Sequence, residues 1–142
     1  MKTEIMIGIG TVGSLVASFF GGWTTSLSTL LIFMIIDYVT GLVVAGVFHK
    51  SKKTDSGALE SRAGFKGLCK KGMILVLVLV GYRLDLTTGT TYIRDGVCIA
   101  FIANEAISIC ENAGLMGIKI PPVIENAIDV LKKKGDGQVE DK

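Results

Sequence analysis

The chain has 142 residues, a formal net charge of +2 and a hydrophobic fraction of 49%. So small a charge, without a basic stripe that carries interleaved aromatic residues, argues against a nucleic-acid-binding protein. Cys69, Cys98 and Cys110 form no C-x-x-C pair, and the single histidine, His49, has no neighbouring ligand pattern. We therefore expect no metal site and no cofactor, and we interpret the cysteines as small apolar residues.

The distribution of charge is more informative than its sum. Charged residues are nearly absent from residues 5–36, 38–48, 72–82 and 96–104 and are concentrated in residues 49–71 and 119–142. A bilayer core requires about 20 apolar residues in a helix. The alternative is a soluble bundle, but its surface helices would each need a polar face. We predict an all-α integral membrane protein with three to four transmembrane helices and a short C-terminal amphipathic helix.

The first apolar segment, residues 5–20, is short and contains Gly8, Gly10 and Gly13. The glycines match the G-x-G-x-x-G dinucleotide pattern, but no alternation of strands and helices surrounds them, so we reject that function. No clear cleavage site follows, and we expect the segment to be retained. Sixteen residues are few for a span. If the segment lies along the surface, the chain has three spans rather than four.

The second segment, residues 27–48, carries a carboxylate, Asp37, near its middle. An acidic residue at the centre of a spanning helix costs about 2.5 kcal/mol or more, so it is expected to have a structural or functional role. Gly41 and Ala45 follow at helical spacing and complete a stripe of small residues. Such a stripe allows two helices to approach closely, either between two copies of the chain or within one chain.

The connection at residues 49–71 is strongly basic. An excess of lysine and arginine indicates the cytoplasmic side, so we place this loop and the C-terminus inside. The short connections, residues 21–26 and 88–96, then lie outside. The basic residues of the loop are Lys50, Lys52, Lys53, Arg62, Lys66, Lys70 and Lys71.

The third segment, residues 73–88, contains Arg83. Counted from the cytoplasmic end of each segment at 1.5 Å per residue, Arg83 and Asp37 both lie about 16 Å deep. Opposite charges at one depth on neighbouring helices predict an ion pair. In the alternative, Arg83 extends toward the outer surface and Asp37 is protonated.

The fourth segment, residues 97–118, has one polar face. Asn104, Ser108 and Glu111 lie close together on a helical projection, flanked by Glu105 and Asn112. Because such a face is unfavourable against lipid, it is expected to line water or an interface between subunits. A single chain of three or four helices has little interior for it, so we predict self-assembly.

The remaining residues, 119–142, form a separate tail after the transmembrane part at residues 1–118. Pro121 and Pro122 end the preceding helix, and residues 123–131 have apolar side chains at helical spacing before Lys132, Lys133 and Lys134. The pattern is typical of an amphipathic helix on the inner membrane surface, although a plain soluble cap fits it equally well. Residues 135–142 are polar and predict a frayed end.

An ordered set of short motifs resembles one family. They run from residue 21 to residue 131 and are Gly22-Trp23, Asp37-Tyr-Val-Thr-Gly41, Gly64-Phe-Lys-Gly67 with Lys70-Lys71, Ala103-Asn-Glu105 with Ser108-Ile-x-Glu111-Asn112, and Gly117-Ile-Lys-Ile-Pro121. This set is similar to that of phage holins of the toxin-secretion/phage-lysis type.

The resemblance implies a non-enzymatic protein of the bacterial cytoplasmic membrane that oligomerises. It implies lesions through which an endolysin or a large toxin leaves the cell. The intramembrane polar positions of that family correspond here to Asp37, Asn104, Glu105 and Glu111.

Two other functions fit the residues. In a small-solute channel or transporter subunit, Asp37, Arg83 and Glu105 would form a gated ion path. In an assembly or anchor protein, the same polar residues would serve packing without a pore. The chain shows no catalytic triad, phosphate-binding loop or metal cluster that would favour an enzyme.

Overall fold

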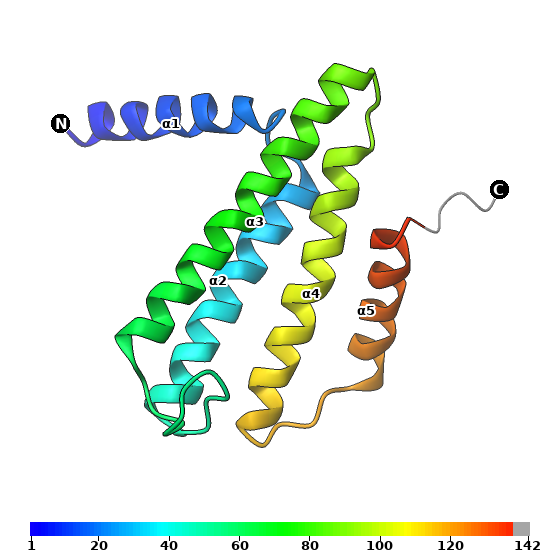
Figure 1. Ribbon diagram of the computed structural model, residues 1–142. Helices are drawn as coiled ribbons and strands as arrows, with labels where there is room; N and C mark the ends of the chain where they lie inside the picture. Colours follow the sequence, from blue (N-terminus) through cyan, green and yellow to red (C-terminus); the bar gives the residue numbers. More distant parts are fainter. Residues whose placement is uncertain (138–142) are drawn as a thin grey trace.

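The computed structural model describes residues 1–137, and this part of the chain consists of five α-helices joined by loops (Figure 1). The all-α prediction is confirmed, with helix ends within a few residues of the predicted ones except in α3. The predicted frayed end lies mostly in residues 138–142, outside the described residues. The helices are α1 (Lys2–Phe19), α2 (Thr25–Gly46), α3 (Ser61–Thr88), α4 (Ile93–Leu115) and α5 (Pro122–Gly135).

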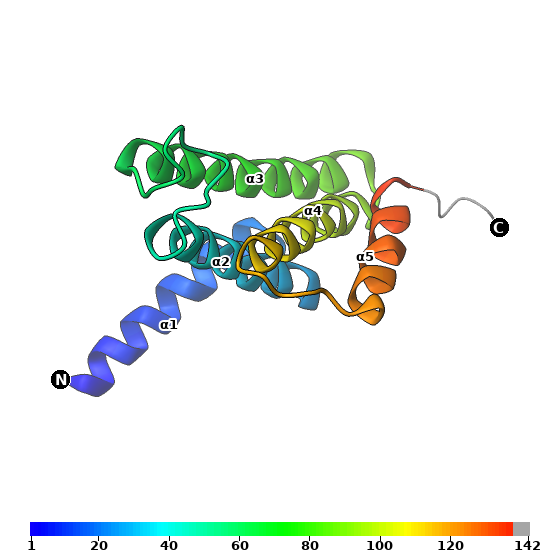
Figure 2. The same ribbon diagram turned by 90° about the horizontal axis from the view of Figure 1, so that it is seen from below.

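Helices α2, α3 and α4 form the body of the molecule. Helix α4 packs against both α2 and α3, whereas α2 and α3 contact each other very little. Figures 1 and 2 show α2 and α4 running in the same direction, with α3 antiparallel to both. Buried apolar side chains of α2, α3 and α4 meet around α4 and form a core. They are Leu27, Leu30, Met34, Val78, Cys98 and Ile102.

Local sequence explains where several helices begin and end. The Thr24 hydroxyl accepts a hydrogen bond from the Leu27 backbone N–H at 3.1 Å and caps the start of α2. Gly89 ends α3 with φ of 75°, a left-handed conformation that glycine adopts without strain. Pro122 occupies the first position of α5, where its missing N–H has no intrahelical partner to lose.

Helix α3 begins at Ser61, 12 residues before the predicted start at residue 73. The prediction was wrong because it used apolar residues as the sign of a helix, and the first three turns of α3 are polar and basic. The predicted loop at residues 49–71 is therefore shorter. Of the seven basic residues of that loop, four lie on α3, namely Arg62, Lys66, Lys70 and Lys71. The other three, Lys50, Lys52 and Lys53, lie in the connection before it.

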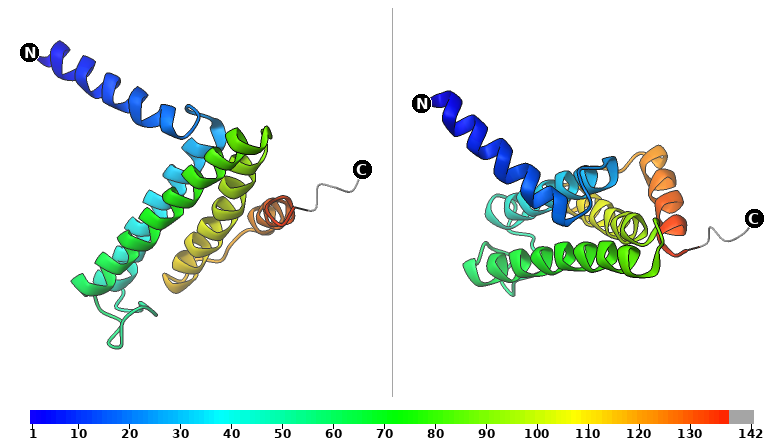
Figure 3. Two further views of the ribbon diagram at one scale, coloured as in Figure 1. Left: turned by 45° about the horizontal axis from the view of Figure 1, so that its top comes forward. Right: turned by 90° about the horizontal axis from the view of Figure 1, so that it is seen from above.

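Helix α1 leaves the bundle sideways (Figures 1 and 3). Its side chains are largely exposed, and Ala17 near its end is buried. The turn between α1 and α2 requires Gly21, whose φ is +88° and whose added Cβ would lie 2.5 Å from the Tyr82 ring. Within α1, the hydroxyls of Thr11 and Ser18 donate to carbonyls of the same helix. The helix therefore satisfies these polar groups without outside partners.

The helices differ in their fitness to cross a membrane. Over residues 1–137, one helix, α2, is long and apolar enough to span a bilayer when length and composition alone are considered. The structure therefore gives one candidate span, where the sequence analysis predicted three to four.

Candidate functional site

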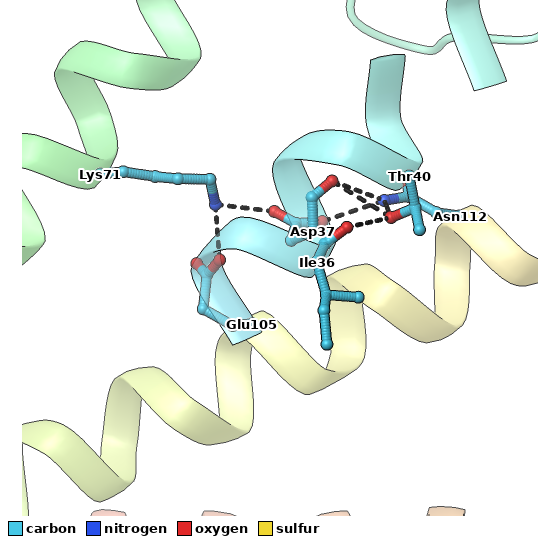
Figure 4. A network of polar contacts seen from close by, with 6 residues as sticks. All are labelled: Ile36, Asp37, Thr40, Lys71, Glu105 and Asn112. Atoms are coloured by element: carbon cyan, nitrogen blue, oxygen red, sulfur yellow. Dashed lines mark hydrogen bonds and ion pairs between the residues drawn. The ribbon is translucent and has the colours of Figure 1, made fainter. Parts of the chain in front are cut away.

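A polar layer joins the three helices of the body. The Lys71 ammonium group on α3 donates to Asp37 Oδ2 on α2 at 2.9 Å and to Glu105 Oε1 on α4 at 2.5 Å (Figure 4). The three side chains are well buried, with 13%, 6% and 8% of their surfaces exposed, respectively. One cation thus holds two carboxylates together and connects all three helices.

An amide completes the layer on the other side of Asp37. Asn112 Nδ2 on α4 lies 3.0 Å from Asp37 Oδ1 and 2.8 Å from Thr40 Oγ1 on α2 (Figure 4). It also lies 3.2 Å from the Asp37 backbone oxygen. The Asp37 carboxylate is therefore bound on both oxygens. No buried side-chain nitrogen or oxygen among the described residues lacks a partner. Hydrogen-bond partners of this kind are what allow a polar side chain to be buried in a folded protein.

The layer lies at one level of the bundle. Asp37 is nine residues before the end of α2, Lys71 is ten residues into α3, and Glu105 is ten residues before the end of α4. At 1.5 Å per residue, each is about 14–15 Å from the helix end nearest the basic connection. A cavity of about 340 Å³ extends between the layer and that connection, and its walls include Lys52, Glu60, Ser108 and Glu111.

The chemistry of the layer is electrostatic rather than catalytic. With both carboxylates ionised, two negative charges share one positive charge. Buried charges are stable while they remain paired, and removing one partner costs several kcal/mol. The arrangement thus fixes the register of three helices and leaves one excess negative charge inside the bundle.

The comparison with known families decides the identity. Residues 14–133 match the bacteriophage holin family. The chain belongs to this family. Holins are non-enzymatic membrane proteins, which agrees with the sequence-based expectation that the chain is not an enzyme.

The chain is also similar to curated proteins over most of its length, and one of them is named a probable holin. The uncharacterized protein Lin0175 of Listeria innocua is 37% identical over 141 residues, covering 99% of this chain and 95% of the relative. An uncharacterized 14.9 kDa protein in the nagH 3′ region of Clostridium perfringens is 39% identical over 129 residues, with coverage of 89% and 92%. A protein of Bacillus phage phi105, named a probable holin, is 30% identical over 115 residues, with coverage of 80% and 79%. No solved structure matches the chain.

The structure corrects the predicted partner of Asp37. The ion pair of this carboxylate is with Lys71, not Arg83, and Arg83 is exposed on α3. The error follows from the start assigned to α3. When depth is counted from Ser61 instead of residue 73, Lys71 replaces Arg83 at the level of Asp37. Lys71 therefore belongs to the polar layer rather than to the basic loop.

The polar face of α4 is divided in two. Glu105 and Asn112 turn into the bundle, while Asn104 and Glu111 are exposed and Ser108 is partly buried. The argument that one chain lacks room for these residues was wrong for Glu105 and Asn112, because Lys71 and Asp37 satisfy them. Asn104 and Glu111 thus remain exposed on α4 in the single chain.

The stripe of small residues on α2 faces α4 of the same chain. Asp37 and Ala45 are buried, and a Cβ built on Gly41 would lie 3.9 Å from Asn112 Nδ2. Of the two interpretations left open by spacing, the structure shows the contact within one chain.

A second polar cluster at the opposite end of the body escaped the sequence analysis. Asp85 accepts hydrogen bonds from the Ile93 and Arg94 backbone N–H groups at 2.9 and 3.0 Å and from Thr90 Oγ1 at 2.6 Å. It therefore caps α4 from α3. Arg94 donates to the Phe20 carbonyl at 2.7 Å and ties the end of α1 to the start of α4. The sequence did contain a signal for this cap. Asp85 lies eight residues before the start of α4, and helix starts favour negative charge.

Proposed function

We propose that this member of the holin family spans the bacterial cytoplasmic membrane several times, oligomerises and forms lesions that release an endolysin or a large toxin. The polar layer carries the proposal. Asp37, Lys71 and Glu105 are charged, yet they lie inside a body whose α2 and α3 expose apolar side chains. Intramembrane charges of this kind face a helix-bundle interior or water and mark functional sites.

The pairing explains how α3 and α4 can cross a bilayer despite their composition. Hydropathy counts Lys71 and Glu105 as isolated charges, whereas in the bundle the two side chains form an ion pair with each other, and Lys71 also pairs with Asp37. Their cost in the membrane is therefore lower than single-helix composition suggests. We place α2, the apolar part of α3 and α4 across the membrane, with the basic connection in the cytoplasm.

Cysteine labelling tests this orientation. In a chain with Cys69→Ser, Cys98→Ala and Cys110→Ser, a Ser56→Cys substitution places one thiol at an exposed position of the basic connection. A membrane-impermeant thiol reagent should leave it unmodified in intact cells and modify it after permeabilisation. Modification from outside would contradict the orientation. A tag at Met1 separately determines whether α1 is a fourth span, in which case the tag lies in the cytoplasm.

Release of a co-expressed muralytic enzyme tests the function. Expression of the chain should collapse the membrane potential and allow the enzyme to reach the cell wall, so that the culture lyses. A Glu105→Leu chain should insert but release the enzyme late or not at all, because Lys71 then loses one carboxylate. If the membrane depolarises but the enzyme never leaves the cytoplasm, the release function is wrong.

One observation favours a second function, a small-solute channel subunit. The cavity of about 340 Å³ lies within a single chain and is lined by charged side chains of both signs, so an ion could enter it without assembly. Marker size separates the two functions. A holin lesion passes markers of kilodalton size, whereas a channel through single subunits passes ions and excludes those markers.

A further inference from the structure

Helix α5 lies alongside α4 rather than beyond its end. Figure 1 shows it turning back after the loop that follows α4, and Figure 2 shows it on the side of α4 away from α2. Ile128 is buried in this contact, and Leu131 packs against the core. At Gly135 the approach is very close, because an added Cβ would lie 2.7 Å from the Ala100 Cα.

The contact reaches far along α4. Ala100 is 15 residues before the end of α4 at Leu115, which corresponds to about 22 Å along the helix axis. A bilayer core is about 30 Å thick. If α4 spans the membrane, the end of α5 is therefore well within the depth of the hydrocarbon region.

The charges of α5 are incompatible with lipid at that depth. Five charged side chains lie on this helix, and all are exposed: Glu125, Asp129, Lys132, Lys133 and Lys134. A single such group at the centre of a bilayer costs about 2.5–3.5 kcal/mol on insertion scales. The docked position of α5 therefore requires water on this side of the molecule.

The rest of the same side is also polar. The exposed Asn104 and Glu111 of α4 belong to it, whereas the outward side chains of α2, such as Ile32, Ile35 and Val39, are apolar and suited to lipid. The body thus has a side for lipid at α2 and a side for water at α4 and α5.

We propose that α5 is a strap with two positions and that its docked position belongs to the open lesion. Docked along α4, it forms with Asn104 and Glu111 the wall that faces water in the assembly. Before opening, it lies on the inner membrane surface, where its lysines meet anionic headgroups. This inference rests on the proposed holin function.

The connection before α5 is long enough for both positions. Residues 116–121 link the two helices and can extend over about 20 Å. Gly117, with φ of +92°, and Pro121 keep this segment out of helix. The strap can therefore move as a unit without unwinding α4.

Disulfide trapping tests the docked position. In a chain with Cys69→Ser, Cys98→Ala and Cys110→Ser, the pair Ala100→Cys and Gly135→Cys should cross-link in oxidant-treated cells after triggering, with at least fivefold less product before it. The control pair is Ala100→Cys with Val123→Cys, because Val123 is exposed at the far end of α5. Equal cross-linking before and after triggering, or release without any cross-link, would overturn the strap.

A bulky residue at Gly135 gives a second test that does not depend on thiols. Gly135→Leu blocks the approach to Ala100 but leaves an amphipathic helix that can still bind the membrane surface. Ala127→Leu, at an exposed position of α5, is the matched control. The Gly135→Leu chain should insert and form cross-linkable oligomers, with enzyme release reduced at least tenfold, while the control releases normally.

The outcomes separate the strap from the holin function itself. If the unmodified chain releases no muralytic enzyme, the proposed function is wrong whatever α5 does. If the unmodified chain and Gly135→Leu release the enzyme equally, the function stands and the strap is wrong.

Discussion

The two ends of the α2–α4 body are held together by different forces. Near the basic connection, the helices meet through Asp37, Lys71 and Glu105 beside a cavity. At the opposite end, they meet through apolar packing around Leu30 and Val78, and Asp85 caps the next helix. The apolar end stabilises the fold by burying apolar surface. The charged end fixes the register of the three helices, although removing its charges from water costs free energy.

The difference indicates which end can rearrange. An apolar core loses contacts gradually when helices separate, and it gains nothing from water. A charged layer exchanges its partners for water with less loss, because hydration replaces the ion pairs. Under the proposed function, the end that contains the polar layer is therefore the one expected to open in an assembly, while the other end keeps the three helices together. Substitutions at each end show whether the two ends differ in this way.

Lys71→Met should have the largest effect. It leaves Asp37 and Glu105 buried with no cation between them, and breaking a buried ion pair in this way costs about 3–5 kcal/mol. We expect loss of folded protein, measured as the free energy of unfolding in detergent and as protease sensitivity. Lys70→Met, at the exposed neighbouring position, is the control and should change stability little. Equal stability of the two variants would contradict a structural role for the layer.

Removing all three charges should restore much of what Lys71→Met loses. In a chain with Asp37→Asn, Lys71→Met and Glu105→Gln, no ionised group is left unpaired, so the three changes are expected to be strongly non-additive. The recovered stability is measured in the same unfolding experiment. Additive losses would show that the three side chains act separately, and the charged end would then not differ in kind from the apolar end.

Asp85→Ala should have an intermediate effect at the apolar end. The substitution removes the acceptor for the backbone N–H groups of Ile93 and Arg94, and loss of such a cap costs about 0.5–2 kcal/mol. The bundle should stay folded, with earlier fraying at the start of α4 in hydrogen exchange. Thr87→Ala is a matched control, because the Thr87 hydroxyl bonds only to its own helix at the Arg83 carbonyl. Global unfolding by Asp85→Ala would mean that packing alone does not hold this end.

Gly41→Ala should have the smallest effect. The added methyl group meets Asn112 Nδ2 at 3.9 Å, an ordinary contact, and alanine favours a helix interior by up to about 1 kcal/mol over glycine. The unfolding free energy should stay equal or rise slightly. If the monomer is unchanged but cross-linked oligomers disappear, Gly41 also contacts a second copy of the chain.

Much of the fold followed from the distribution of apolar residues, because long uncharged runs have few alternatives to helix. The start of α3 did not follow, since residues 61–72 contain charges whose roles depend on other helices. The error carried through to the site, where Arg83 took the place of Lys71. Asp37, Glu105 and Asn112 could be selected as unusual polar residues within apolar segments. Their partners could not, because pairing depends on register in three dimensions.

The contact pattern of the body also bears on how the chain is made. Helices α2 and α3 leave the ribosome first, yet they touch each other little, and both rely on α4 for packing. During synthesis, Asp37 and Lys71 can meet, but neither the apolar core nor Glu105 is present until α4 has been translated. A nascent chain that stops before Ile93 therefore lacks the apolar core, and the three-helix body can pack only after α4 has been translated.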